Sequence, residues 1–396
     1  MLKTTTKLVV VDDEEDLAEF VADVADGVGF DATFLSDPHD FAEHYSIDIG
    51  VFVFDLFMPG IDGIELLRFL AESRSNASVI FMSGKDKSVL KAAQELAKSL
   101  EINVLGSIQK PFRAADLEEI LEGYSPPAAD SLVSPKHEAP TIDELREAIE
   151  KKQFHLVYQP QVSLKDYTFS GVEALIRWNH PVKGSISPDV FIPMAEEYNL
   201  IQEITWFVAH EALMQAGEWR KQGYDLRLSI NMSPKNFQDL DLPEKLATLA
   251  QFAGADVDKI MIEVTETALM VDVSRYIDVL TRLRMKGFGL SIDDFGTGYS
   301  SLQQLIRVSF NELKIDQTFI RDIETEQECQ VITEISSMLA HKLNMYVVAE
   351  GIENENIWNH LRALGCEEGQ GYWIAKPMRP EELGGWYKDW VIRQGL

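Results

Sequence analysis

The stretch Leu290-Ser291-Ile292-Asp293-Asp294 joins a run typical of a buried strand to a pair of acids. The same arrangement occurs at Leu228-Ser229-Ile230-Asn231, at Ile260-Met261-Ile262-Glu263, and at Tyr346-Val347-Val348 shortly before Glu350. Buried parallel strands are largely hydrophobic, and a β/α barrel keeps its chemistry at the carboxyl ends of its strands. The repetition therefore predicts a barrel with an acidic mouth, as in a metal-dependent enzyme.

Polar residues of this kind are spread over the last two-thirds of the chain. In order they are Glu173-Ala174-Leu175, Asn231, Glu263, Asp293-Asp294, Lys314, Glu350 and Gln370. If the strand ends converge on one mouth, four oxygen ligands face one cation, and Asp293 can bridge to a second cation beside Asp294. Buried carboxylates in this number cannot stay ionised together without cations.

Two cations about 3.5–4 Å apart can clamp the attacking and leaving oxygens of a phosphoryl displacement. Lys314 would orient the attacking water. Glu350 would take its proton or act as a further ligand, and the sequence leaves these two roles open.

Composition limits the classes of partner. Lys and Arg total 36 against 65 Asp and Glu, a net charge of −29 in 396 residues. Such acidity disfavours nucleic-acid polymers and anionic membranes, and a phosphate-bearing substrate needs cations to bridge it. With two cysteines and no apolar run near the ~20 residues of a membrane span, we expect a cytoplasmic protein.

The first 123 residues alternate strand and helix patterns, which predicts a doubly wound, five-stranded parallel sheet. Residues 124–140 contain four prolines and read as a linker, and residues 141–396 match the size of a (β/α)8-type barrel. The expected strands of the first domain are Leu8–Val11, Ala32–Leu35, Val51–Phe54, Val79–Met82 and Val104–Ile108, with helices in Glu15–Asp26, Ile64–Ser73 and Ser88–Leu100.

The strand ends of this first domain gather Asp12, Asp13 and Asp55, with Ser83 after the fourth strand and Lys110 after the fifth. Clustered carboxylates favour Mg²⁺, and a lysine and a hydroxyl can hold phosphoryl oxygens. Residues 5–123 resemble the receiver domain of response regulators. The motifs are Val11-Asp12-Asp13, Phe54-Asp55-Leu56-Phe57-Met58-Pro59-Gly60, Met82-Ser83-Gly84 and Lys110-Pro111-Phe112.

That resemblance implies a flavodoxin-like fold in which Asp55 accepts a phosphoryl group from a cognate sensor histidine kinase. Asp12 and Asp13 would hold one Mg²⁺, while Ser83 and Lys110 would sense the phosphate. One position departs from the family pattern, because Gly106 is followed by Ser107 instead of an aromatic residue. Signalling by an aromatic switch is therefore in doubt.

Residues 141–396 resemble the EAL-domain cyclic di-GMP phosphodiesterases. The motifs are Tyr158-Gln159-Pro160, Glu173-Ala174-Leu175-Ile176-Arg177-Trp178, Asn231-Met232-Ser233, Glu263-Val264-Thr265-Glu266, Asp293-Asp294-Phe295-Gly296-Thr297-Gly298, Leu313-Lys314-Ile315-Asp316, Ala349-Glu350-Gly351-Ile352-Glu353 and Gln370-Gly371-Tyr372. The resemblance implies hydrolysis of cyclic di-GMP to linear pGpG with two Mg²⁺ or Mn²⁺ ions.

Carried over position by position, the implied metal ligands are Glu173, Asn231, Glu263, Asp293 and Asp294. Glu173, Lys314 and Glu350 are the implied catalytic residues. The implied substrate contacts are Gln159, Leu175, Arg177, Asp316, Glu353 and Gln370.

Glu266 has two interpretations. In the family the matching glutamate holds the loop that begins at Asp293-Asp294, and glycines in Phe295–Ser301 suit a mobile gate. The alternative is a solvated glutamate at a helix start.

The sequence thus predicts a response regulator that hydrolyses cyclic di-GMP and whose activity is modulated by phosphorylation at Asp55, as a dimer or tetramer if it follows the family. The rival hypothesis is a barrel that binds the nucleotide without cleaving it, and it is disfavoured because every ligand position is filled. The hypothesis of a transcription factor is not supported, because the sequence shows neither a helix-turn-helix nor a basic face.

Overall fold

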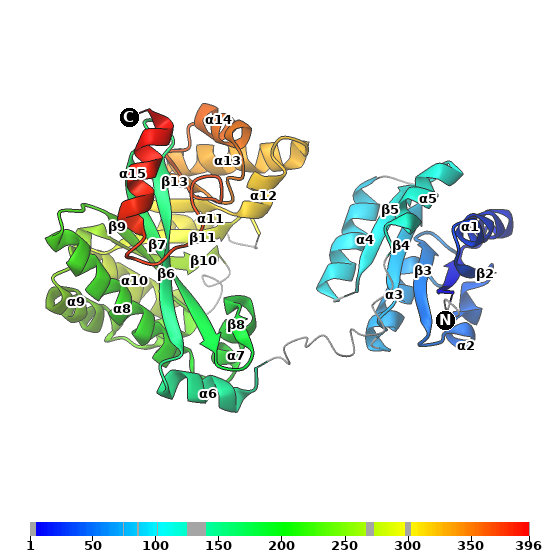
Figure 1. The fold of residues 1–396 in the computed structure, drawn as a ribbon, viewed down its shortest axis with the longest axis horizontal. Coiled ribbons are helices and arrows are strands. Elements are labelled where there is room, and N and C mark those ends of the chain that lie inside the picture. Colours follow the sequence, from blue (N-terminus) through cyan, green and yellow to red (C-terminus); the bar gives the residue numbers. More distant parts are fainter. Residues whose placement is uncertain are drawn as a thin grey trace. The chain divides into compact units, whose positions relative to one another are not determined.

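The computed structural model describes residues 5–73, 75–84, 87–100, 102–124, 140–266, 273–297 and 302–395. The chain divides into two compact units, residues 1–136 and 137–396 (Figure 1). The predicted linker, apart from residues 124 and 140, lies outside the described residues. Across the described ranges, no helix combines the length and apolar character needed to cross a bilayer.

The first unit is a parallel five-stranded sheet in the order β2-β1-β3-β4-β5. This confirms the predicted doubly wound sheet. Its elements are β1 Lys7–Val11, α1 Glu15–Gly27, β2 Asp31–Leu35, η1 Pro38–Asp40, α2 Phe41–His44, β3 Ile49–Asp55, α3 Gly63–Glu72, β4 Ser78–Ser83, α4 Lys87–Ser99, β5 Val104–Gln109 and α5 Ala114–Glu122.

Alternate residues of the central strands enter two separate cores, one on each face of this sheet. Phe52 and Phe54 of β3 pack in the core that includes α3 and α4, whereas Val51 and Val53 pack in the core that includes α1 and α5. Because side chains alternate across a strand, a strand with both faces covered is hydrophobic throughout. The strand ends therefore remain as the place for polar residues.

The second unit is an eight-stranded barrel in the order β6-β14-β13-β12-β11-β10-β9-β7, closed by pairing of β6 with β7, and β8 extends β7 outside the ring. Helices surround the barrel (Figure 1). Its strands are β6 Phe154–Ser163, β7 Phe169–His180, β8 Gly184–Ile186, β9 Arg227–Asn231, β10 Ile260–Thr265, β11 Gly289–Phe295, β12 Glu312–Ile315, β13 Tyr346–Ala349 and β14 Glu368–Gly369.

The helices of the second unit begin with a capping box, in which Thr141 and Glu144 cap each other's backbone at the start of α6. The helical elements are α6 Ile142–Glu150, α7 Pro188–Glu197, α8 Ile201–Lys221, η2 Pro234–Gln238, α9 Leu242–Ala253, η3 Val257–Lys259, α10 Val273–Met285, α11 Leu302–Arg307, α12 Gln317–Arg321, α13 Gln327–Lys342, α14 Glu355–Ala363 and α15 Leu383–Gln394.

The first barrel strand departs from an all-parallel β/α pattern. β6 runs antiparallel to both neighbours, β7 and β14. The reason is the short connection between β6 and β7, because a parallel pair needs a crossover of a dozen or more residues. The remaining neighbours in the ring pair in parallel, so their carboxyl ends meet at one mouth.

Candidate active site

Lys314 lies at the centre of the acidic mouth. It is the third residue of β12, and 1% of its side chain is exposed. Its Nζ lies 2.7 Å from Glu350 Oε1 and 3.1 Å from both Glu263 Oε2 and Asp293 Oδ1. Glu173 Oε2 follows at 3.5 Å. One buried ammonium thus contacts four carboxylates, which leaves an excess of negative charge in a low-dielectric site.

Burial and mutual repulsion set the protonation of this cluster. Burial raises the pKa of Glu263 well above its ordinary range and raises that of Asp293, and Lys314 only partly opposes this. Burial by itself would lower the pKa of Lys314, but the surrounding carboxylates outweigh it and hold that pKa well above the ordinary lysine value. The cluster therefore needs further positive charge to ionise fully.

Glu173 is held by amide groups as well as by Lys314. Its Oε1 accepts a hydrogen bond from Asn231 Nδ2 at 2.7 Å, and its Oε2 accepts one from Gln370 Nε2 at 2.6 Å. Burial favours its neutral form, but Lys314 and these amides outweigh burial, so the pKa of Glu173 is lowered. Gln370 Nε2 also donates to Gln159 Oε1 at 3.0 Å.

The position of Glu173 differs from the prediction in one respect. Glu173 lies within the 12-residue strand β7 and not at its end. β7 continues beyond the barrel ring because it pairs with the antiparallel strands β6 and β8. Glu173 still reaches the mouth, since it pairs with Gln159 of β6 and Ser229 of β9.

The carboxylates form two groups of three that share Asp293. In the first group, one oxygen from each of Glu173, Glu263 and Asp293 lies within 4.8 Å of the others. The same spacing holds in the second group, which combines Asp293 with Asp294 and Glu350. An all-oxygen donor set suits hard divalent cations, so the residues of these groups fit a metal of that class.

The second group is the more accessible one. The Glu350 side chain is 17% exposed, and burial together with the other carboxylates raises its pKa to about 8. Asp294 has a left-handed backbone (φ +54°), and burial and Asp293 raise its pKa to about 7. Strained backbone of this kind concentrates at functional sites.

Glu266 is buried behind the loop that follows Asp294. Only 4% of Glu266 is exposed, and its Oε2 accepts a hydrogen bond from the backbone N–H of Gly296 at 2.9 Å. Gly296 has φ +101°, and a Cβ there would meet the Phe319 ring at 2.8 Å. The alternative of a solvated glutamate is therefore wrong. Residues 298–301 of the predicted gate lie outside the described residues.

A cavity of about 470 Å³ opens beside the carboxylates. Leu175, Arg177, Asn231 and Glu263 line it, together with apolar side chains of α7 and α8. Arg177 is half-buried, and desolvation lowers its pKa. The cavity combines an apolar wall with one guanidinium and with Glu263 of the carboxylate cluster, the mixture of apolar surface and a few polar groups typical of a ligand site.

The last two predicted substrate contacts lie in different surroundings. Asp316 is 8% exposed, caps α12 through the Thr318 N–H at 2.8 Å, and lies close enough to Asp294 to raise its pKa. The Glu353 side chain is 52% exposed and pairs with Arg321 at 3.5 Å. The structure brings Asp316 to the mouth, while Glu353 stands apart from the carboxylate contacts given above.

Sequence reasoning missed the glutamine below this site. Gln161 is 1% exposed, and its Nε2 donates to Gln370 Oε1 at 3.1 Å. It therefore fixes the amide that holds Glu173. Its position could have been predicted, because Gln161 comes two residues after Gln159 and residues at this spacing lie on the same face of a strand.

The first unit assembles the predicted receiver residues at one edge of its sheet. Oxygens of Asp12, Asp13 and Asp55 lie within 4.8 Å of one another. Lys110 Nζ donates to Asp12 Oδ2 at 2.7 Å and to Asp55 Oδ2 at 3.0 Å. Burial raises the pKa of Asp12, which again favours a divalent cation. Ser83 is fully buried at the end of β4.

Ser107 occupies the position at which the receiver family carries an aromatic residue. It is half-buried in β5, and its Oγ accepts a hydrogen bond from Gln94 Nε2 of α4 at 3.2 Å. A polar contact therefore joins β5 to α4 at this position.

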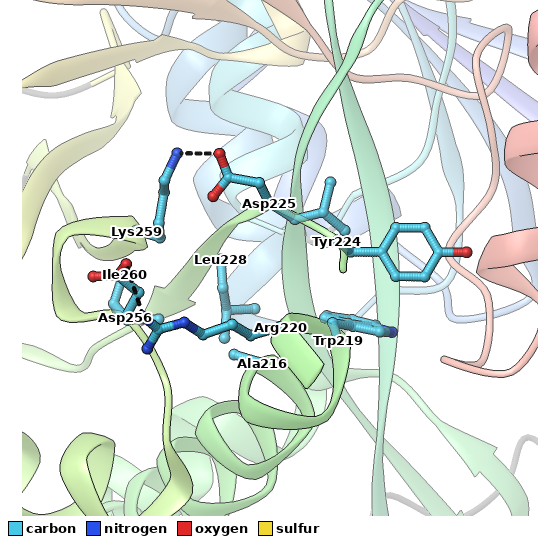
Figure 2. A pocket seen from close by; sticks show the side chains of 10 residues that line it. Ala216, Trp219, Arg220, Tyr224, Asp225, Leu228, Asp256, Lys259 and Ile260 are labelled. Carbon is cyan, nitrogen blue, oxygen red and sulfur yellow. Dashed lines mark hydrogen bonds and ion pairs between the residues drawn. The ribbon is translucent and has the colours of Figure 1, made fainter. Parts of the chain in front are cut away.

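A separate small pocket lies at the other end of the barrel strands. Leu228 and Ile260, near the starts of β9 and β10, line it with residues of α8 (Figure 2). Lys259 pairs with Asp225 at 3.0 Å across its rim. Its lining contains none of the predicted site residues.

Comparison with known proteins adds evidence on the family of each unit. The receiver-domain family model matches residues 8–122, and the EAL-domain model matches residues 142–377. The cyclic di-GMP phosphodiesterase RocR of Pseudomonas aeruginosa is 32% identical over 339 residues, covering 84% of this chain and 85% of RocR. The cyclic di-GMP phosphodiesterase PA2567 of the same organism is 41% identical, covering 61% of this chain and 40% of that protein.

Among solved structures, the cyclic di-GMP complex of the PaMucR phosphodiesterase matches with a TM-score of 0.59 and 37% identity, covering 61% of this chain and 98% of that one. The cAMP- and cyclic-di-GMP-bound form of the EAL enzyme Bd1971 matches with a TM-score of 0.59 and 31% identity, covering 76% of this chain and 75% of that one. Together with the family matches, these likenesses show that the chain belongs to the EAL-domain family and carries a response-regulator receiver domain ahead of its barrel.

Proposed function

We propose that this protein is a response regulator that hydrolyses cyclic di-GMP to linear pGpG at the mouth of its barrel. The observation that carries the proposal is the pair of carboxylate groups sharing Asp293 around the buried Lys314. RocR, which matches this chain over 85% of its own length, is a cyclic di-GMP phosphodiesterase and supports the choice of substrate.

In this proposal Glu173, Asn231, Glu263, Asp293 and Asp294 hold two divalent cations, Mg²⁺ or Mn²⁺. Bound cations would acidify water and offset negative charge on the phosphodiester. The all-oxygen character of both groups supports this assignment.

The protein's own groups supply the rest of the chemistry. Lys314 orients the carboxylates, because its ammonium contacts four of them at 2.7–3.5 Å. Glu350 receives the proton of the attacking water, since it is more exposed than Glu173, Glu263 and Asp293. Water adds to phosphorus while the bond to the 3′ oxygen breaks. The 3′ oxygen gains a proton that balances the one taken up by Glu350, which leaves a 3′ hydroxyl and a 5′ phosphate and returns Glu350 to its ionised form.

Substrate contacts follow from the cavity beside the carboxylates. Arg177 and Leu175 line the cavity, so the guanidinium would pair with a phosphate oxygen while the apolar wall receives a base. Gln159, Gln370 and Asp316 lie around the mouth and complete the proposed contacts, with Glu353 as the outermost.

Phosphorylation of Asp55 by a sensor histidine kinase would modulate this activity. The support is the cluster of Asp12, Asp13 and Asp55 around one cation site, with Lys110 in contact with two of the carboxylates. Bound Mg²⁺ would offset the charge of the incoming phosphoryl group, and Lys110 and Ser83 would contact its oxygens.

We also propose that the protein forms homo-oligomers through α13. Val331, Ile335 and Met338 are 44%, 53% and 54% exposed, and their spacing places them on one helix face. The neighbouring Ile332 would lie 3.5 Å from a Cβ at Gly296, so the same helix packs against the loop held by Glu266. A second copy bound to this face would therefore contact the helix that packs against the loop after Asp294.

The test is incubation of the full chain with cyclic di-GMP and Mg²⁺, followed by chromatographic separation of nucleotides. We expect pGpG, none in EDTA, and none from Glu173→Ala. Glu147→Ala is the matched control, because Glu147 is an exposed glutamate paired only with Lys151 among the ion pairs of the described residues. Tight binding of cyclic di-GMP without product in Mg²⁺ and in Mn²⁺ would overturn the enzyme and leave a nucleotide sensor.

A further inference from the structure

Three polar side chains form a row in the barrel interior that begins at Glu263 of the carboxylate cluster. Glu263 of β10 pairs in register with Ser291 of β11, which pairs with Glu312 of β12. Register partners on neighbouring strands present their side chains on the same face of a sheet. Since Glu263 faces the interior and contacts Lys314, Ser291 and Glu312 face the interior too. All three are at most 1% exposed.

Each of the three has one buried polar atom without a partner among the described residues: Glu263 Oε1, Ser291 Oγ and Glu312 Oε1. The second oxygen of each carboxylate is already used. Glu263 Oε2 accepts from Lys314 at 3.1 Å, and Glu312 Oε2 lies 3.3 Å from Arg227 Nη1. Buried polar atoms of folded proteins are almost always hydrogen-bonded, so three adjacent unpartnered atoms indicate a missing partner.

The chemistry of the three atoms identifies what kind of partner is missing. Two of the three atoms are carboxylate oxygens, which accept whenever the carboxylate is ionised, and the Ser291 hydroxyl has a single hydrogen to donate. That hydrogen satisfies one carboxylate and leaves the other without a donor. The site is therefore short of donors, and a water molecule brings two. Buried waters make about three hydrogen bonds each, which matches three atoms in a row.

A cation is the other species that could satisfy these oxygens. It is disfavoured at this position because Glu312 already pairs with Arg227, and the divalent cations proposed at the mouth would meet the excess charge around Glu263. Arg227 also pairs with Glu368 of β14, so Glu312 is anchored across the barrel. A neutral donor completes the hydrogen bonds without adding charge.

We propose that the barrel interior contains an ordered water molecule that is hydrogen-bonded to Glu263 Oε1, Ser291 Oγ and Glu312 Oε1. Through this water, Ser291 and Glu312 act as positioning residues that fix the orientation of the Glu263 carboxylate. The last step rests on the proposed function, because it assigns Glu263 as a metal ligand. Groups that orient metal ligands typically change metal affinity by about 10- to 100-fold when removed.

The first test is a high-resolution crystal structure of the unmodified full chain, with and without Mn²⁺. We expect one ordered water within about 2.6–3.2 Å of all three atoms in both states. Crystals soaked in Rb⁺ separate the alternatives, because an anomalous peak at this position would overturn the water assignment in favour of a monovalent cation. Direct contact among the three side chains, with no density between them, would overturn it as well.

The second test measures Mn²⁺ affinity by electron paramagnetic resonance without nucleotide. We expect Ser291→Ala to weaken the tighter barrel-site Mn²⁺ by about 10-fold. Glu312→Gln should do so less, because its amide brings a donor of its own. The matched control is Thr333→Val, which removes an equally buried hydroxyl on α13, unpartnered among the described residues, and should leave the affinity unchanged.

Unchanged Mn²⁺ affinity in folded Ser291→Ala would refute the positioning role. The two proposals fail separately. A protein that does not hydrolyse cyclic di-GMP can still show the water, whereas hydrolysis with no water between these atoms refutes the inference alone.

Discussion

Glu266 and Gly296 are joined by a hydrogen bond of 2.9 Å between a buried carboxylate and a backbone N–H, 30 residues apart in the chain. Gly296 follows Asp294 by two residues and has a backbone conformation that suits glycine. The contact thus ties the strand that carries Glu263 to the start of the loop after Asp293-Asp294.

Glu266→Ala should release this loop and weaken metal binding. Hydrogen bonds to charged groups contribute about 1.5–3 kcal/mol. We therefore expect the Mg²⁺ concentration for half-maximal hydrolysis to rise several-fold, with a smaller change at saturating Mg²⁺. Glu147→Ala serves as the control, and unchanged turnover at limiting Mg²⁺ would refute the prediction.

Lys314→Met should destabilise the metal-free protein more than the metal-loaded one. Removing one partner from a buried ion pair costs about 3–5 kcal/mol, because the other charges remain without compensation. Divalent cations can replace part of that compensation. Thermal denaturation in EDTA and in Mg²⁺ measures the difference, and equal losses of Tm in both buffers would contradict this account. Hydrolysis should fall at least 100-fold.

The metal-free protein should lose stability as pH rises through neutrality. Glu350 has its pKa raised from 4.5 to about 8, and Asp294 from 3.8 to about 7. Between these values the folded state binds more protons than the unfolded state, so stability is highest below about pH 4.5 for these groups and declines up to about pH 8. Denaturation in EDTA from pH 5 to 9 measures the slope.

Metal affinity should show the opposite dependence on pH. Ligand carboxylates must lose their protons to bind a cation, so Mn²⁺ should bind more tightly at pH 8 than at pH 6 and release protons on binding. Calorimetric titrations in buffers of different ionisation enthalpy count those protons. Glu350→Gln should release fewer of them, because the raised pKa of Glu350 keeps it protonated near neutral pH until cations bind beside it. An unchanged count would show that Glu350 does not lose a proton when the cations bind.

Asp55→Asn should abolish every response to a small-molecule phosphoryl donor. The substitution keeps the shape of the side chain near Lys110 but removes the nucleophile. We expect the unmodified chain to shift in phosphate-affinity electrophoresis and to change its rate of hydrolysis, whereas Asp55→Asn should do neither. Asp31→Asn, at an exposed position of β2, is the control.

Ile335→Glu should dissociate the oligomer. A charge in the middle of the exposed stripe of Val331, Ile335 and Met338 would be buried against a second copy at high cost. Light scattering after size exclusion measures the mass, with Gln327→Glu on the same helix as a control of equal charge change. A mass that Ile335→Glu leaves unchanged would rule out this face.

Much of the site was predictable because barrel geometry converts sequence order into proximity. Acids in or just after the buried parallel strands of a barrel, such as Glu263 and Asp293, lie at the mouth where the carboxyl ends of those strands meet. What could not be predicted depends on pairing across long distances. The antiparallel direction of β6, the link from Gln161 to Gln370 and the pairing of Arg227 with Glu312 join strands whose contacts no local pattern encodes.

Glu353 shows that a motif position does not by itself place a side chain beside the carboxylate cluster. A motif places it three residues after Glu350, but the chain turns away to begin α14 at Glu355, and the Asn354 side chain caps this helix by accepting a hydrogen bond from the Ile357 N–H. The carboxylate therefore points to Arg321 and solvent.

The closure of the ring by β6 and β14 has a consequence for synthesis on the ribosome. Ser163 pairs with Glu368, so the barrel cannot close until the chain has been made beyond residue 369. Gln370, which holds Glu173, is also translated after every proposed metal ligand. A nascent chain can complete its receiver unit early, since domains fold largely as units from the N-terminus. The amide support of Glu173 therefore arises only near the end of translation, and a chain stopped short of it carries a receiver with an unfinished hydrolytic centre.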